Sequence, residues 1–422
     1  MTKLISILIL VTSMLFNTQL RGQTDSLSFA ECLHLALQNS PGLKSHDASF
    51  EAAITAEKAA RAGYFPHIFA EASHNQLFYS PFDYRQQSGT VLLDWSLGDW
   101  MQKTATVSAK EAEVRTAEKQ TGVLDLVRTV TSLYFGLLRS QKETGLLDKR
   151  LQILREHHDV VRALWQSGVR TELDVLLTNT EINNVQEQRN TQQSETDKLR
   201  QALSSLLNIS ENKTRNVQSF PVGIIAVRPD TTANLLAQHP KLRSLQLQAE
   251  TQKLHLNQVA ATRWPHVQVH GGYVVDRDPT AEGNYWQAGI GLHVPLFRWK
   301  ETSYRKQEIN QLVNVLEWQK KQTELELTIQ QKQLLRELAV LRSNYKLQLE
   351  NVQITGKAIH IATANYQAGL VTNLEYLEAQ KENMTAQVRL YETRLLYATS
   401  LIEYFILTNE MEKIESLQGK NE

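Results

Sequence analysis

An internal repeat restricts the fold of this chain more than any other feature of its sequence. Pro41 and Pro66 in the first half reappear as Pro240 and Pro265 in the second, with the same separation in each pair. The residues around them also match, and the offset between the two copies is close to 200 residues throughout. A repeat of this length predicts two equivalent structural units that pack against each other.

Each half is predicted to contain a short helix, a second helix, two strands and two long helices. The residue before a proline is disfavoured in helix, so each short helix ends ahead of its proline. In the first half the predicted elements are 28–39, 41–62, 65–79, 85–96, 100–165 and 171–208. Their counterparts are 231–238, 240–262, 265–276, 285–296, 301–366 and 372–409. The two repeats then cover 24–210 and 231–409, with an equatorial connector at 211–230 and a polar tail at 410–422.

The N-terminus predicts export. Residues 1–23 have the layout of a signal peptide, with Lys3 ahead of an apolar run at 4–16 that is shorter than the roughly 20 residues of a membrane-spanning helix. No second long apolar run follows, so a membrane crossing would require strands closed into a barrel. The 45 basic and 45 acidic residues cancel, which argues against a nucleic-acid-binding protein, since such a protein needs a basic face.

The strands of the second half alternate in polarity, as a transmembrane barrel strand does. Trp286, Ala288, Ile290 and Leu292 fall on one face, and Gln287, Gly289, Gly291 and His293 fall on the other. A soluble, half-buried hairpin alternates in the same way, but the aromatic residues gather at the strand ends, as in interfacial girdles. Four strands are too few to close, since the smallest membrane barrels have about eight. The exposed edges therefore predict oligomerisation.

The long helices carry a coiled-coil-like seam. Leu334, Leu338, Leu341 and Tyr345 step by four and three residues with charged side chains between them. A helix of about 66 residues would be roughly 100 Å long at ~1.5 Å per residue. Two classes of protein fit an exported chain of this kind: a passive channel, and a coiled-coil structural or adaptor protein without a lumen.

The sequence contains no catalytic, phosphate-binding or zinc-binding motif, so we expect neither an enzyme nor a cofactor. His266 and His270 share a strand face, but solvated side chains are the more economical reading, because a divalent metal site needs three or four converging ligands. His157 and His158 are adjacent on a helix and point apart. Cys32 is the single cysteine and is predicted to be a buried apolar residue on the first helix.

At the end of each long helix stands an aromatic residue, then a glycine, then a hydroxyl residue and an acid. The two copies are Trp165-Gln166-Ser167-Gly168 followed by Thr171 and Asp174, and Tyr366-Gln367-Ala368-Gly369 followed by Thr372 and Glu375. With the duplicated strand pairs, these turns resemble the TolC-like outer-membrane efflux family across essentially the whole mature chain. The resemblance implies a mixed α/β, mainly α, fold in which each half supplies two strands to a trimeric 12-stranded transmembrane β-barrel and one helical hairpin to a periplasmic α-barrel.

The resemblance also implies partners and sites. The partners would be two further copies of the chain, a periplasmic adaptor (membrane fusion) protein, an inner-membrane pump and the lipid of a Gram-negative outer membrane. The resistance-nodulation-division type is a candidate for the pump. The docking tips would be Trp165, Gly168, Arg170, Thr171, Tyr366, Gly369 and Thr372. The periplasmic gate would be Asp174, Glu375 and Glu378, since rings of carboxylates set cation preference. The family often has arginine two residues after the second glycine. Here Val371 stands there, and Arg170 occupies the matching place in the first hairpin, four residues before Asp174, where it could neutralise that acid.

Overall fold

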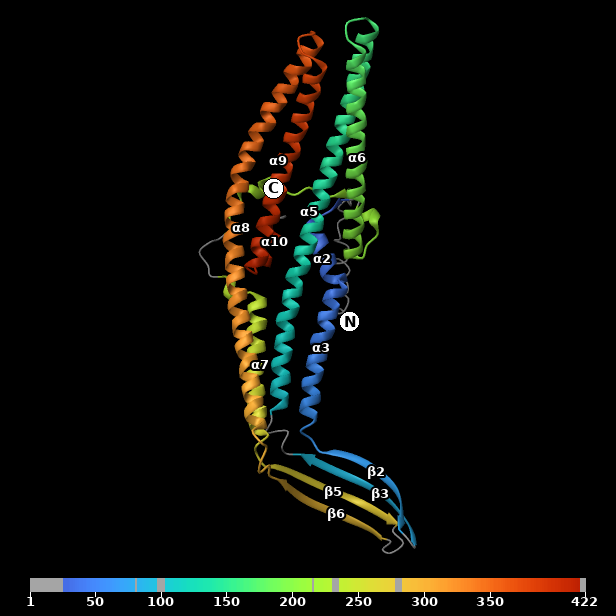
Figure 1. Ribbon diagram of the computed structural model, residues 1–422, viewed down its shortest axis with the longest axis vertical. Coiled ribbons are helices and arrows are strands. Elements are labelled where there is room, and N and C mark those ends of the chain that lie inside the picture. The colour runs from blue at the N-terminus through green and yellow to red at the C-terminus, as the bar shows by residue number, and fades with distance from the viewer. Residues whose placement is uncertain are drawn as a thin grey trace, which may run out of the picture.

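A computed structural model describes residues 26–79, 82–96, 103–214, 216–229, 235–277 and 283–417. The signal peptide predicted at residues 1–23 lies outside these ranges. The described chain is a long rod with a small sheet at one end and the tips of two helical hairpins at the other (Figure 1).

The duplicated order of elements predicted from the sequence is confirmed. The first half contains α2 (Phe29–Asn39), α3 (Pro41–Ala62), β2 (His67–Tyr79), β3 (Phe82–Ser96), α5 (Thr104–Gln166) and α6 (Glu172–Leu207). The second half contains η3 (Leu235–Gln238), α7 (Pro240–Ala261), β5 (His266–Arg277), β6 (Gly283–His293), α8 (Glu301–Gln367) and α9 (Asn373–Leu407). Shorter elements are β1 (Ser26–Leu27), η1 (Glu211–Thr214), β4 (Asn216–Val217), η2 (Val222–Ala226) and α10 (Met411–Ser416).

The prolines that mark the repeat begin helices for a physical reason. Pro41 and Pro240 occupy the first turns of α3 and α7, where their missing N–H is one that the helix would leave unbonded anyway. The residue before each proline supplies the N-cap. Ser40 Oγ accepts from the backbone N–H of Leu43 at 3.4 Å, and His239 Nδ1 accepts from the N–H of Lys241 at 3.2 Å.

Two predicted segments differ from the structure. Of the helix predicted over 231–238, the described residues 235–238 form the 3₁₀ turn η3, and 231–234 lie outside the described ranges. The tail at 410–422 is not polar throughout. Residues 411–416 form α10, and Ile414 and Leu417, which lie three positions apart and so share a helix face, are buried in the core.

The four-stranded sheet at the end of the rod is antiparallel throughout, in the order β2-β3-β5-β6. β3 pairs with β5 and thereby joins the two halves. Within this single chain β2 and β6 are the outer strands. The register puts Val269 opposite Ile290 and Val267 opposite Leu292, so the apolar residues share one face, as their alternation predicts.

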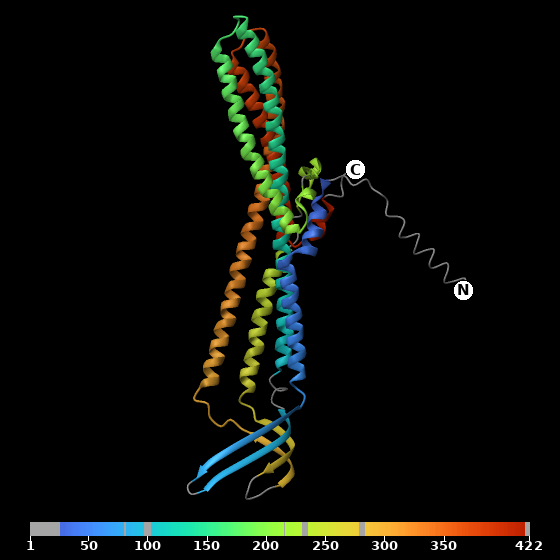
Figure 2. The ribbon, with the colours of Figure 1, turned by 90° about the vertical axis from the view of Figure 1, so that its right-hand side faces the viewer.

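The helices form a wall near the sheet and two hairpins beyond it. In the half next to the sheet, α3, α5, α7 and α8 follow one another side by side (Figure 2). In the other half α5 pairs with α6, and α8 pairs with α9. The 67 residues of α8 span roughly 100 Å at ~1.5 Å per residue. Among the described residues, no helix is both long enough and apolar enough to span a membrane.

The main apolar core lies at the waist of the rod, where α2, α5, α9 and the connector meet. Phe29, Tyr134, Phe135 and Phe220 pack with ring centroids 5.0–6.1 Å apart. The Tyr134 hydroxyl donates to the Gln218 carbonyl at 2.6 Å, which ties the connector to α5. Cys32 is completely buried in this core, as predicted.

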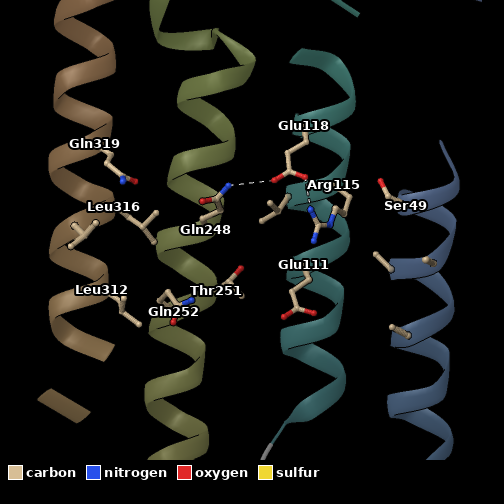
Figure 3. Close-up of a pocket in the computed structure, with 15 residues that line it drawn as sticks. Ser49, Glu111, Arg115, Glu118, Gln248, Thr251, Gln252, Leu312, Leu316 and Gln319 are labelled. Atoms are coloured by element: carbon tan, nitrogen blue, oxygen red, sulfur yellow. Dashed lines mark hydrogen bonds and ion pairs between the residues drawn. The ribbon is translucent and has the colours of Figure 1, made fainter. Parts of the chain in front are cut away.

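A groove of about 900 Å³ is bounded by the four wall helices α3, α5, α7 and α8 (Figure 3). Polar side chains from α5 and α7 line it, and some of them bond to one another. Arg115 pairs with Glu118 at 2.7 Å, and Gln248 donates to the same carboxylate at 3.5 Å. One side of the wall is therefore hollowed, and polar side chains from α5 and α7 line it together with apolar ones from α3 and α8.

Candidate functional site

The two hairpin tips are built by the same turn. Gly168 (φ +77°) follows α5 and Gly369 (φ +75°) follows α8. At each tip the second residue after the C-cap donates its N–H to a carbonyl five residues back, from Val169 to Leu164 at 2.9 Å and from Leu370 to Asn365 at 2.8 Å. This is the Schellman motif, which needs a left-handed residue and so favours glycine.

The hydroxyl residue and the acid after each turn form a capping box. Thr171 Oγ1 accepts from the N–H of Asp174 at 3.4 Å, and the Asp174 carboxylate accepts from the N–H of Thr171 at 3.3 Å. Thr372 and Glu375 repeat this at 3.3 and 2.7 Å. The hydroxyl-x-x-acid spacing of the sequence therefore starts the return helices α6 and α9. Two of the three carboxylates predicted at the gate also have this local role.

The bonds from Thr372 affect the charge of Glu375. The backbone N–H and the hydroxyl of Thr372 both donate to its carboxylate and lower the pKa of Glu375. Glu378 is placed differently, with Lys381 Nζ at 3.7 Å. The charge of Glu378 also stabilises the protonated guanidinium of Arg150, whose closer partner is Glu181.

Arg170 does not pair with Asp174, contrary to the expectation from their four-residue spacing. Its Nη2 donates to the carbonyl of Val371 in the other hairpin at 3.1 Å, and its guanidinium lies 4.7 Å from the ring centre of Tyr366. The four-residue spacing does not predict a pair here, because Arg170 lies in the tip turn and not on a helix. The Asp174 carboxylate is in the capping box of α6, where it is already bonded to Thr171.

The aromatic residues at the two tips have different environments. Trp165 is 39% exposed, whereas Tyr366 is 3% exposed and packs against His157 and Tyr376. The assignment of Tyr366 to a docking surface is therefore wrong, because its ring is covered by the chain itself. Apolar side chains that the tips do expose are Val169, Leu173, Leu370 and Leu374.

The pattern of the sequence does not predict one buried polar pair between the hairpins, His157 and Asn373. His157 Nε2 lies 2.8 Å from Asn373 Oδ1, and Asn373 is fully buried. Helical spacing could have found His157, because it continues a buried stripe with Leu154 and Val161. Asn373 has no such signal, since it occupies the first position of α9 beside an exposed turn.

Comparisons with known proteins agree with this architecture. The family model described as "Outer membrane efflux protein" matches residues 32–208 and 232–405. No curated protein matches the sequence significantly.

Solved outer-membrane channels have the same fold. CusC superposes with a TM-score of 0.79 at 14% identity, over 90% of this chain and 91% of that chain. The outer membrane protein VceC of Vibrio cholerae gives 0.76 at 16% identity, over 89% and 95%. The CmeC outer membrane channel of Campylobacter jejuni gives 0.78 at 15% identity, over 92% and 89%.

The family model covers both repeats, including both strand pairs and both tips. This match favours the channel over the structural or adaptor protein without a lumen. The chain belongs to the outer membrane efflux protein family, and it acts as an efflux duct.

Proposed function

We propose that three copies of this chain form one passive exit duct, embedded in the outer membrane by its sheet and extending into the periplasm. The observation that carries the proposal is the pair of outer strands, β2 and β6, at opposite edges of the sheet. Open edges recruit further strands, and a cyclic assembly would pair β6 of one copy with β2 of the next. Three copies of four strands would then make the 12-stranded barrel.

The helical wall supports the same arrangement. Its outer helices are α3 and α8, which continue directly from the outer strands of the sheet. One side of α8 exposes large apolar residues at helical spacing: Trp318, Leu325 and Ile329. One side of α3 exposes small residues at matching spacing: Ala48, Thr55 and Ala59. We propose that α8 of one copy packs against α3 of the next, large side chains over small.

The polar side chains that line the groove on the wall support a water-filled interior. Charged and amide side chains on the wall helices α5, α7 and α8 face it, among them Glu111, Gln252 and Gln319 (Figure 3). An interior lined in this way can remain hydrated while the apolar edges of the wall are covered by neighbouring copies.

At the far end we propose that the tips bind a periplasmic adaptor protein, which connects the duct to an inner-membrane pump. The resistance-nodulation-division type is the pump class to test first. Exposed Val169 and Leu370 beside the two glycines form the apolar part of this surface, with Trp165, Gly168, Arg170, Thr171, Gly369 and Thr372 around them. Exposed apolar side chains gathered at one end of a molecule are typical of a protein-binding site.

Three carboxylates per copy lie in the first two turns after the tips. Asp174, Glu375 and Glu378 would repeat around the symmetry axis, and we propose that they form the periplasmic gate. Negative rings at a narrow opening favour cations.

The experiment that tests docking places a photo-crosslinking amino acid at Leu370 in living cells. We expect crosslinks to a protein of the adaptor family, identified by mass spectrometry. The same amino acid at Lys198, an exposed position on α6 far from the tip, is the control and should not capture it. Equal capture at both positions, or no adaptor at Leu370 while efflux continues, would contradict docking at the tips.

A further inference from the structure

We propose that His157 and Asn373 form a latch between the two hairpins of one protomer, and that protonation of the imidazole releases it. The latch concerns the relative movement of the hairpins. The latch itself does not depend on the proposed function. Its effect on the duct does, because separation of the tips widens the duct only if three copies form one.

A chain of hydrogen bonds joins three helices at this point. The amide Nδ2 of Asn373 on α9 donates to the carbonyl of Asp174 and to the hydroxyl of Thr178, both on α6 and both at 3.0 Å. With its hydrogens used in this way, Asn373 has Oδ1 left as acceptor for His157 on α5, at 2.8 Å. His157 must therefore carry its proton on Nε2. The first hairpin thus holds the first turn of α9 from both of its helices.

The imidazole occupies a site that suits its neutral form. His157 is 7% exposed. Its ring stacks on Tyr376, with centroids 4.0 Å apart and planes 27° apart, and its centroid lies 4.8 Å from that of Tyr366. A second proton would go on Nδ1 and would place a full charge among these rings and the apolar side chains of Leu154 and Val161. Burial of a charge in such surroundings is costly.

The titratable groups around the ring come from every element packed on it. Asp174 of α6 favours the charged imidazole, and His158 of α5 opposes it. Arg170 lies over the ring of Tyr366 on α8, and Glu156 acts on the hydroxyl of Tyr376 on α9. Removal from water lowers the pKa of the imidazole, and it outweighs the hydrogen bond with Asn373 and the charge of Asp174, which both favour the protonated ring.

The sign of the pH dependence follows from this direction. When the hairpins separate, water reaches the ring, and its pKa returns toward the ordinary value of about 6.5. The latched state then binds fewer protons than the separated state, so the latch is most stable above that pH and weakens as the pH falls toward the lowered pKa. Between the lowered pKa and about 6.5, binding of one proton shifts the equilibrium between latched and separated hairpins by up to about tenfold per pH unit.

The test measures the distance between the tips in the full mature protein, purified in detergent. Spin labels are attached to cysteines at Ser167 and Ala368, the exposed residues that cap α5 and α8, in a Cys32→Ala background. Labelled chains are diluted with unlabelled chains, so that each distance is measured within one protomer. Pulsed electron paramagnetic resonance between pH 7.5 and 5 then gives the population of separated tips.

We expect the separated population to rise as the pH falls, by up to about tenfold per pH unit below about 6.5. His157→Gln keeps a donor for Asn373 but cannot titrate, so its distances should not depend on pH. His158→Gln, the matched neighbour, should keep the pH dependence, with its midpoint moved slightly toward higher pH because His158 opposes the charged imidazole. An unaltered chain without pH dependence, or a His157→Gln profile like that of the unaltered chain, would overturn the latch. The pH series on the unaltered chain tests the latch even if a variant does not assemble. Loss of the adaptor crosslink from Leu370 would contradict docking at the tips and not the latch.

Discussion

Arg170, in the tip turn of the first hairpin, donates from Nη2 to the carbonyl of Val371 in the tip turn of the second at 3.1 Å. The same guanidinium lies over the ring of Tyr366. The arginine that the family resemblance would place on the second hairpin is thus replaced by one on the first, which reaches across. One residue connects both tips of a protomer.

Arg170→Ala should loosen the two tips relative to each other. A hydrogen bond from a charged donor contributes about 1.5–3 kcal/mol, and solvent at this half-buried site reduces that figure to about 1–2 kcal/mol. Limited proteolysis of the tips should be faster in Arg170→Ala at unchanged trimer content. Arg170→Lys should recover only part of the protection, because an ammonium group lacks the planar surface that stacks on Tyr366. Equal proteolysis of all three proteins would show that the contact does not hold the tips.

The face of the sheet can be tested by introducing charge. Ile290 is 78% exposed and Leu292 is 65% exposed on the apolar face of β6, where an arginine near the bilayer midplane costs roughly 2–4 kcal/mol. Ile290→Arg should therefore reduce the amount of assembled protein in the outer membrane. Gln287→Arg, on the opposite face of the same strand, is the control and should have a smaller effect. If both substitutions reduce assembly equally, the assignment of the faces is wrong.

Gly369→Val should abolish efflux while the trimer stays in the outer membrane. No atom lies within 4 Å of a Cβ added at Gly369, but φ is +75°, and a left-handed residue with a side chain costs roughly 1–2 kcal/mol. The tip turn would change its path, and the adaptor crosslink from Leu370 should disappear. Gly356→Ala, in the interior of α8 with open space around it, is the matched control and should retain both. Normal efflux with an intact crosslink in Gly369→Val would refute the docking assignment.

Glu375, at the proposed gate, should keep its charge in mild acid. Because Thr372 donates two bonds to Glu375, the pKa of Glu375 is lowered, and the carboxylate stays ionised at pH values below the ordinary value of about 4.3. The capping bonds and the cation preference from this residue should be present above that value and be lost as the pH falls through the lowered pKa. Planar-bilayer reversal potentials measured against pH give the midpoint.

The double variant Glu375→Gln with Glu378→Gln separates the gate from the cap. It should lower cation selectivity and weaken block by multivalent cations, without dissociating the trimer. Selectivity and block like those of the unaltered channel would leave these residues with structural roles only.

The repeat and the strand alternation predicted most of the fold because both depend on local chemistry. Pro41 and Pro240 begin helices because proline suits the first position of a helix. Gly168 and Gly369 end helices because glycine adopts the left-handed conformation that the turn needs. Partners across the hairpins could not be predicted in this way. The contact of Arg170 with Val371 and the bond between His157 and Asn373 join positions about 200 residues apart, and which of them meet depends on how two long helices are rotated against each other.

The capping boxes are an intermediate case. The spacing of Thr372 and Glu375 contains the signal for a helix start, whereas the family resemblance implied that the Glu375 carboxylate belongs to a gate. The structure assigns the bond and leaves the pore-lining role as a proposal. Tyr366 was misassigned because its position in the motif equals that of Trp165, whereas its burial depends on Tyr376 and His157 from other helices.

The native mass of the mature protein, extracted in detergent and measured by mass spectrometry, tests the central claim most directly. The outer strands β2 and β6 and the apolar side of α8 require neighbouring copies, so we predict three chains in one particle. Trp318→Glu, which places a charge on that exposed side, should shift the mass toward single chains, whereas the unaltered protein stays trimeric. A stable monomer of the unaltered protein under native conditions would contradict the duct.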